Sequence, residues 1–274
     1  MAQIFSRPIQ LALEHERWIL WAVALFPLLA VMLIAIFKLM PRLYMFLIRE
    51  DGLVEWATAV TYLLAAGFAV SLVLHFRRRQ EWIYVLLYGV LGAGMFVIAM
   101  EEISWGQRQL GIKTPPSIAE RNYQGELNFH NLSGFPLHKA YIAVGFYGAF
   151  ARLIAMPLLI KRFPKFVDLV TPPYALSLFF FIPFAYYAYN EFLYYTEVLP
   201  RGLTWSEYWR AEEHIIIGGD QEPIELLLAL GFLVFTVLNW IRYRVGAPLT
   251  LGATAGTGLL ASDGPTSAKK PAAF

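Results

Sequence analysis

The feature that most constrains this chain is a series of apolar segments, each about as long as a bilayer is thick. A hydrocarbon core about 30 Å thick needs roughly 20 helical residues, because an α-helix rises about 1.5 Å per residue. Six segments qualify, approximately 18–40, 53–75, 82–100, 139–160, 174–195 and 223–241. Only 15% of the residues are charged, which leaves too little polar surface for a water-soluble globule. The sequence therefore predicts an all-α integral membrane protein, a bundle of six transmembrane helices over residues 18–241.

Basic residues mark one side of this predicted membrane domain. They gather after the second, fourth and sixth segments, at Arg77–Arg79, Lys161–Lys165 and Arg242–Arg244. The positive-inside rule makes that side the cytoplasm, and six spans place both termini there. We expect a multi-pass protein of the plasma membrane, the inner membrane of a bacterium. Residues 1–17 then form a cytoplasmic interfacial segment or a frayed terminus, and residues 242–274 form a disordered cytoplasmic tail.

The two long connections on the opposite side, 101–138 and 196–222, differ in composition from the short basic ones. Aromatic residues are too frequent there for a solvated coil, and long loops in compact domains are usually functional or disordered. These aromatic residues are Trp105, Tyr123, Phe129, Phe135, Trp205, Tyr208 and Trp209. We therefore expect the long connections to form a small folded extracytoplasmic cap.

Two adjacent glutamates end the third apolar segment. Glu101 and Glu102 stand at a helix C-terminus, where the macrodipole disfavours negative charge by about 0.3–1 kcal/mol. One interpretation is an ion pair with Arg108 that merely ends the helix. The other is that at least one carboxylate faces a polar cavity between the helices, because carboxylates at membrane depth rarely face lipid.

Further carboxylates fall at the same predicted side of other segments. Glu55 lies in the second segment, Glu191 ends the fifth, and Glu222 and Glu225 begin the sixth. Glu222 also suits the positive end of the helix dipole, which is a purely structural explanation. Packing in a bundle would bring several of these side chains around one cavity. Crowded carboxylates must share protons, pair with arginine or bind a metal ion.

A row of polar side chains alternates with apolar ones in the first long connection. Gln124, Glu126, Asn128 and His130 would lie on one side of an extended stretch, with Asn131 next to them. Amide, carboxylate and imidazole groups together suit the binding of a sugar, a headgroup or a metal ion. The alternative is a network in which the same side chains satisfy the loop backbone.

These features predict an outward-facing pocket that acts on a lipid or lipid-linked substrate, as a metal-assisted hydrolase or transferase. We expect membrane lipids as partners, and as cofactor a divalent metal ion whose identity the spacing leaves open. The catalytic candidates are Glu101, Glu102 and His130; the substrate-binding candidates are Arg108, Gln107, Gln124, Glu126, Asn128 and Asn131; the metal candidates are Glu55, Glu101, Glu102, Glu191 and His130; and Glu222, Glu225 and His214 are further candidates.

Two other classes of function fit the same residues. A non-catalytic accessory or assembly subunit of a larger membrane complex would pair each carboxylate with arginine and expose outer aromatics to membrane-protein partners. A cation-coupled transporter would place its carboxylates deeper and break its helices. Nucleic acid is not an expected partner, since the net charge is only +2 and no basic domain exists. The absence of cysteine excludes thiolate zinc sites and cysteine nucleophiles.

Overall fold

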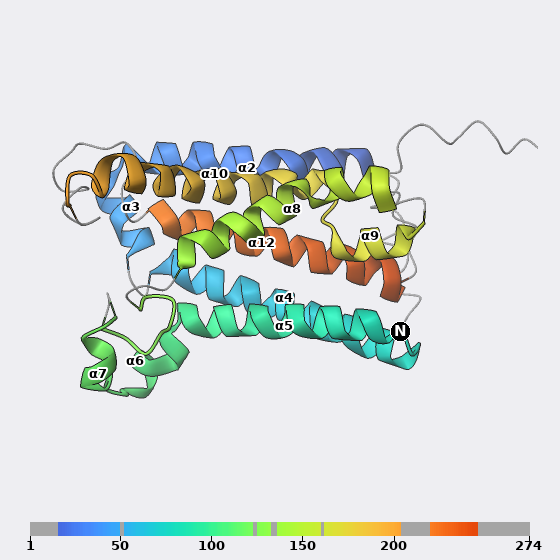
Figure 1. Ribbon diagram of the computed structural model, residues 1–274, viewed down its shortest axis with the longest axis horizontal. Helices are drawn as coiled ribbons and strands as arrows, with labels where there is room; N and C mark the ends of the chain where they lie inside the picture. Colours follow the sequence, from blue (N-terminus) through green and yellow to red (C-terminus); the bar gives the residue numbers. More distant parts are fainter. Residues whose placement is uncertain are drawn as a thin grey trace, which may run out of the picture.

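The computed structural model describes residues 16–49, 52–122, 125–132, 136–159, 162–203 and 220–245. Over these residues the protein is helical, with connecting loops and one isolated bridge between Asn122 and Leu132. The long helices run along the long axis of the molecule (Figure 1). They are α2 (Glu16–Lys38), α4 (Leu53–Arg78), α5 (Trp82–Glu102), α8 (Leu137–Leu159), α10 (Ser177–Leu193) and α12 (Gln221–Trp240).

Short helices occupy the connections between the long ones. Several of them begin with proline, whose fixed φ and missing N–H suit the first helical turn. The short elements are α3 (Pro41–Ile48), η1 (Ser104–Gly106), α6 (Gln107–Leu110), α7 (Pro116–Ala119), α9 (Pro164–Val170) and η2 (Tyr174–Leu176). The wider turns η3 (Tyr194–Val198) and η5 (Ile241–Val245) continue α10 and α12. The elements η1, α6 and α7 lie together beyond the C-terminus of α5 (Figure 1), and we call them, with the loop to Leu132, the cap.

Within the described residues, five segments are long and apolar enough to cross a membrane. They are Trp21–Lys38, Pro41–Arg78, Trp82–Glu102, Pro164–Val198 and Gln221–Tyr243. The prediction of an all-α chain with membrane-spanning helices is confirmed to that extent. Helix α8 covers the predicted segment 139–160 and is 23 residues long, but it is not one of these five. The count of six spans therefore stays a prediction.

Helix α12 separates two helix pairs. Helices α4 and α5 pack against each other along their lengths, and α12 packs against α4. On the other side α8 packs against α10, which also contacts α12. Helices α5 and α8 make at most slight contact with each other, and side chains of both line the two cavities described below.

Glycines allow α8 to approach α10 closely. A Cβ atom on Gly148 would lie 2.2 Å from the ring of Phe180, and one on Gly145 would lie 2.8 Å from Cβ of Phe184. Any larger residue at these positions would push the two helices apart. Small residues at such crossings are typical of helix pairs in membranes.

The two ends of the bundle differ in charge. The acidic end holds the C-termini of α5 and α10 and the N-termini of α4 and α12, with the glutamates singled out above. The basic end holds Arg77–Arg79, and there Arg152, only 5% exposed, donates a 2.6 Å hydrogen bond to Asp168. Three predicted segments lie outside the described residues. They are the interfacial segment before residue 16, residues 204–219 of the second long connection, and the tail from residue 246.

Candidate carboxylate site

Three carboxylates from two helices converge at the acidic end. Glu102 ends α5, while Glu222 and Glu225 lie three residues apart, on one face of α12. One oxygen atom from each lies within 4.8 Å of the other two. Glu102 and Glu225 are buried, and Glu222 is half-buried. We call these three residues the carboxylate triad.

The negative charge of the carboxylate triad requires compensation. Among the residues that the structure describes, neither Glu102 nor Glu225 pairs with a lysine or arginine. Glu55 and Glu101 are near enough to interact electrostatically with Glu102, which adds to the negative potential. Buried like charges at this spacing are stable only when they share protons or a cation.

The spacing of the carboxylate triad fits a hard divalent cation. Two oxygens on opposite sides of an ion with metal–oxygen distances of about 2.1–2.4 Å lie about 4.2–4.8 Å apart. The three oxygen atoms fall within that limit. An all-oxygen ligand set suits Mg²⁺, Mn²⁺ or Ca²⁺ better than Zn²⁺, which favours histidine and cysteine in proteins.

Buried tyrosines surround the carboxylate triad. The Tyr187 hydroxyl donates a 2.5 Å hydrogen bond to Oε1 of Glu225, and its ring stacks on Tyr141 at 4.4 Å between centroids. Tyr62 is fully buried, and its hydroxyl has no hydrogen-bond partner within the described part of the chain. It interacts electrostatically with Glu102 and Glu225. An unsatisfied hydroxyl beside two carboxylates is a donor available to a ligand.

A cavity of about 310 Å³ gives access to one member of the carboxylate triad. We call it the acidic cavity, and it lies between α5, α8, α12 and the cap. Its polar lining consists of Tyr62, Glu101, Glu102, His130 and Tyr141. Its apolar lining includes Val97 and Ile98 of α5, Val144 of α8, and Leu228 and Phe232 of α12.

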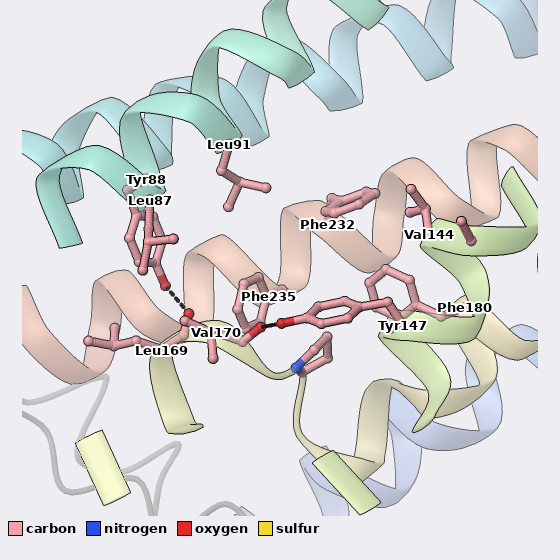
Figure 2. A pocket seen from close by; sticks show the side chains of 13 residues that line it. Leu87, Tyr88, Leu91, Val144, Tyr147, Leu169, Val170, Phe180, Phe232 and Phe235 are labelled. Carbon is pink, nitrogen blue, oxygen red and sulfur yellow. Dashed lines mark hydrogen bonds between the residues drawn. The ribbon is translucent and has the colours of Figure 1, made fainter. Parts of the chain in front are cut away.

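A second cavity of about 430 Å³ lies farther along between α5 and α8 (Figure 2). We call it the apolar cavity. Two of its lining residues, Val144 and Phe232, also line the acidic cavity. The hydroxyls of Tyr88 and Tyr147 donate to the carbonyls of Leu169 and Val170 at 2.9 and 2.7 Å, the dashed lines in Figure 2.

Glu101 anchors the cap rather than joining the carboxylate triad. Its Oε2 accepts hydrogen bonds from the backbone N–H groups of Phe129 (2.6 Å) and His130 (3.0 Å), and its Oε1 accepts one from Nε1 of Trp105 (2.6 Å). The His130 ring lies between Glu101 Oε2 (3.3 Å from Nδ1) and the Asn131 amide (3.0 Å from Nε2). The three catalytic candidates are therefore divided: Glu102 belongs to the carboxylate triad, His130 belongs to the cap, and Glu101 lies in α5 and holds the cap through hydrogen bonds.

Two residues at the start of the cap, directly after α5, have unusual backbone angles. Ser104 and Trp105 both have left-handed backbone conformations, with φ of 46° and 57°. Such angles cost non-glycine residues about 1–3 kcal/mol each unless the surroundings enforce them. The hydrogen bond from Trp105 to Glu101 is one of the contacts that hold this turn.

Four of the substrate-binding candidates hydrogen-bond to one another or to the cap backbone. Glu126 accepts hydrogen bonds from Ser104 and Arg108, and Asn128 Nδ2 lies 3.0 Å from the Ser104 hydroxyl. The side-chain oxygen Oε1 of Gln107 accepts a 2.6 Å hydrogen bond from the backbone N–H of Leu127. This arrangement corresponds to the loop-capping alternative considered from the sequence.

The remaining candidates lie apart from the carboxylate triad or outside the described residues. Glu191 lies 3.4 Å from Nδ1 of His138, and the His138 ring is 5.2 Å from that of Tyr187. Gln124 and His214 fall in segments that the structure does not describe.

The tyrosines around the carboxylate triad were not among the site candidates taken from the sequence. Tyr62 lies two helical turns after Glu55, and Tyr187 lies one turn before Glu191. These spacings place each tyrosine on the same helix face as a candidate glutamate, which was the signal in the sequence. The role of Tyr141 depends on its stack against Tyr187, which no local pattern reveals.

Comparison with known proteins adds no family to this description. No protein-family model, curated protein or solved structure matches the sequence. The function is therefore argued from the site alone.

Proposed function

We propose that the protein is a multi-pass inner-membrane enzyme, a metal-assisted hydrolase or transferase that acts on a lipid or lipid-linked substrate. The observation that carries the proposal is the convergence of Glu102, Glu222 and Glu225 beside a cavity between α5, α8 and α12. The basic end faces the cytoplasm in this proposal, so the carboxylate triad works at the outer face of the membrane.

The carboxylate triad is proposed to bind one divalent cation. Glu102, Glu222 and Glu225 would hold the ion, which would supply Lewis-acid activation of a water molecule and of a phosphoryl or carbonyl oxygen of the substrate. Glu102 is the member of the triad that lines the acidic cavity, so it is the carboxylate placed to accept a proton there. The Tyr62 hydroxyl is placed to donate a hydrogen bond to an oxygen that gains negative charge.

The pairing of the carboxylates supports an enzyme over an accessory subunit. An accessory subunit was expected to have each carboxylate paired with arginine. Glu126 pairs with Arg108 and Glu197 with Arg201, but Glu102 and Glu225 have no such partner among the described residues. A structural role alone does not account for two buried carboxyl groups that have no arginine partner among the described residues.

Direct binding of Mn²⁺ to the purified full-length protein tests the proposal. After chelator-free detergent extraction, free Mn²⁺ is measured by electron paramagnetic resonance during titration of wild type, Glu102→Gln and Glu225→Gln. We expect one site per chain in the wild type and a loss of affinity of at least about tenfold in both variants.

Glu197→Gln is the matched control, because it makes the same change in a carboxylate that is 39% exposed and paired with Arg201. It should bind Mn²⁺ as the wild type does. A wild type without a site, or a Glu102→Gln variant with unchanged affinity, contradicts the proposal.

A further inference from the structure

We propose that the cap lies against the lipid headgroup layer at the acidic end of the bundle and contacts it through an apolar surface. That surface consists of Trp105, Leu110, Ile112 and Phe129, whose exposed fractions are 39%, 72%, 47% and 61%. We call it the cap surface. This proposal concerns how the protein meets the membrane, and it does not rest on the proposed metal-assisted function.

The side chains of the cap surface lie close together at the end of α5. One carboxylate of α5 accepts hydrogen bonds from both the indole N–H of Trp105 and the backbone N–H of Phe129. The Cδ1 atom of Leu110 lies 3.8 Å from the position that a Cβ atom on Gly106 would take, and Gly106 is the chain neighbour of Trp105. Ile112 follows Leu110 after a single residue. The cap surface is therefore one compact patch.

The cap lies to the side of the bundle as well as beyond its end. In Figure 1, α6 and α7 extend past the C-terminus of α5 and also away from α12. A membrane crossed by the long helices lies roughly perpendicular to the long axis of the bundle. On the side of α5 away from α12, the cap therefore extends over the membrane beside the bundle.

The cap surface continues the apolar exterior of α5. Helix α5 is long and apolar enough to cross a membrane, and its side chains Leu86, Val90 and Phe96 are exposed. Exposed apolar side chains on a membrane-spanning helix contact lipid. Trp105 comes three residues after the end of α5, at the level of the membrane–water interface, where tryptophan is enriched. Lipid thus covers the surface that adjoins the cap surface.

The charged residues of the cap also suit a headgroup layer. Lys113 directly follows Ile112 and is exposed. Its ammonium group can reach lipid phosphates while its hydrocarbon stem lies along apolar surface. Glu120 and Arg121, at the end of α7, are exposed as well. Tryptophan and aliphatic side chains beside lysine are typical of segments that lie in the plane of the interface.

The cap surface adjoins the acidic cavity at Phe129. This residue lines the cavity, and it is also among the exposed side chains of the cap surface. A lipid in the headgroup layer would reach Glu102 at this point without passing through water. Only this last step rests on the proposed function, because it supplies the metal-assisted site with a substrate from the membrane.

Nitroxide labels on single cysteines test the cap surface, because the chain has no cysteine of its own. Full-length Leu110→Cys and Ile112→Cys are labelled and placed in nanodiscs of phosphatidylethanolamine and phosphatidylglycerol. Power saturation compares collisions of the label with oxygen, which concentrates in lipid, and with a water-soluble nickel chelate. The oxygen-to-nickel ratio should be at least about threefold higher than for Glu120→Cys, the exposed control in the same cap. Phe96→Cys on α5 gives the reference value for lipid.

A second variant separates the cap surface from the apolar character of the label itself. In the Ile112→Cys protein, Leu110→Ser removes an apolar side chain of the cap surface and should lower the ratio at the label by at least about twofold. Glu120→Ser in the same protein is the matched control and should leave the ratio unchanged. Thermal unfolding of each variant shows that it is folded.

Each outcome decides for or against the membrane contact. Ratios at Leu110 and Ile112 equal to the ratio at Glu120 would place the cap surface in water and overturn the proposal. Few collisions with either reagent would mean that protein covers the cap surface, which overturns it as well. A protein that shows the high ratio but binds no Mn²⁺ supports the membrane contact and rejects the metal-assisted function.

Discussion

The Tyr187 hydroxyl donates its hydrogen bond to Oε1 of Glu225, across a 2.5 Å contact that joins α10 to the start of α12. Both side chains are buried, and the Tyr187 ring stacks on Tyr141 of α8. Three helices thus fix the position of one carboxylate. A ligand site needs such support, because an acidic side chain free to rotate would leave its neighbours without a defined geometry.

Replacing Tyr187 with phenylalanine should weaken the carboxylate triad without disturbing the ring stack. The lost hydrogen bond leaves a buried carboxylate oxygen without its donor, which costs about 1–3 kcal/mol of stability. Mn²⁺ affinity should fall by about tenfold, as for other residues that orient a ligand. Thermal unfolding and Mn²⁺ titration measure the two effects. Tyr189→Phe, at a residue that is 46% exposed, should change neither, and a Tyr187→Phe variant identical to wild type would show that the bond is unimportant.

Glu101→Gln should loosen the cap. The carboxylate accepts hydrogen bonds from two backbone N–H groups and from Trp105, and an amide in its place directs an NH₂ group at some of these donors. Hydrogen bonds to a charged group contribute about 1.5–3 kcal/mol each, so hydrogen exchange in residues 125–132 should become at least about tenfold faster. Glu120→Gln, at an exposed position in the cap, is the control.

The effect of Glu101→Gln on metal binding separates its role from that of Glu102. Because Glu101 bonds to the cap and lies outside the carboxylate triad, its replacement should reduce Mn²⁺ affinity much less than Glu102→Gln does. An equal loss of affinity in both variants would mean that Glu101 is also a ligand.

The helices could be predicted from the sequence because they depend on local patterns. The predicted segment 53–75 became Leu53–Arg78, and the predicted segment 82–100 became Trp82–Glu102. Long apolar runs bounded by charged residues or proline leave few alternatives to a helix of that length. The differences lie at the ends, where polar residues extend a helix beyond its apolar part.

The different roles of Glu101 and Glu102 could not be predicted from local sequence patterns. Adjacent helical side chains point about 100° apart, so the two carboxylates meet different neighbours although both line the acidic cavity. Whether Glu101 or Glu102 joins the carboxylate triad depends on where α12 and residues 129–130 pack, and those contacts are remote in sequence. The alternating row from Glu126 to His130 was ambiguous for a related reason, since the same polar groups satisfy either a ligand or the loop backbone.

Gly148→Ala should separate α8 from α10. The added Cβ would lie 2.2 Å from the Phe180 ring, and overpacking of this kind costs about 1–3 kcal/mol. Gly89→Ala on α5 is the matched control, because nothing lies within 4 Å of its Cβ position and alanine favours a helix by up to about 1 kcal/mol. Thermal unfolding should therefore shift down for Gly148→Ala and stay level or rise for Gly89→Ala. Equal shifts would show that the α8–α10 crossing tolerates a methyl group.

Asp168→Asn should destabilise the basic end. Arg152 is buried and donates to Asp168, and Arg242 lies 3.4 Å from the same carboxylate. Removing the negative charge leaves the buried Arg152 guanidinium uncompensated. For a fully buried pair this costs about 3–5 kcal/mol of stability. The cost should be smaller here, because the Asp168 side chain is 28% exposed. Glu197→Gln breaks an exposed pair with Arg201 and should cost at most about 1 kcal/mol. The double variant Arg152→Met with Asp168→Leu should recover much of the loss, since apolar replacement of a buried pair is often neutral. Thermal unfolding in detergent compares the four proteins, and an Asp168→Asn variant no less stable than Glu197→Gln would mean that Arg152 draws its compensation from elsewhere.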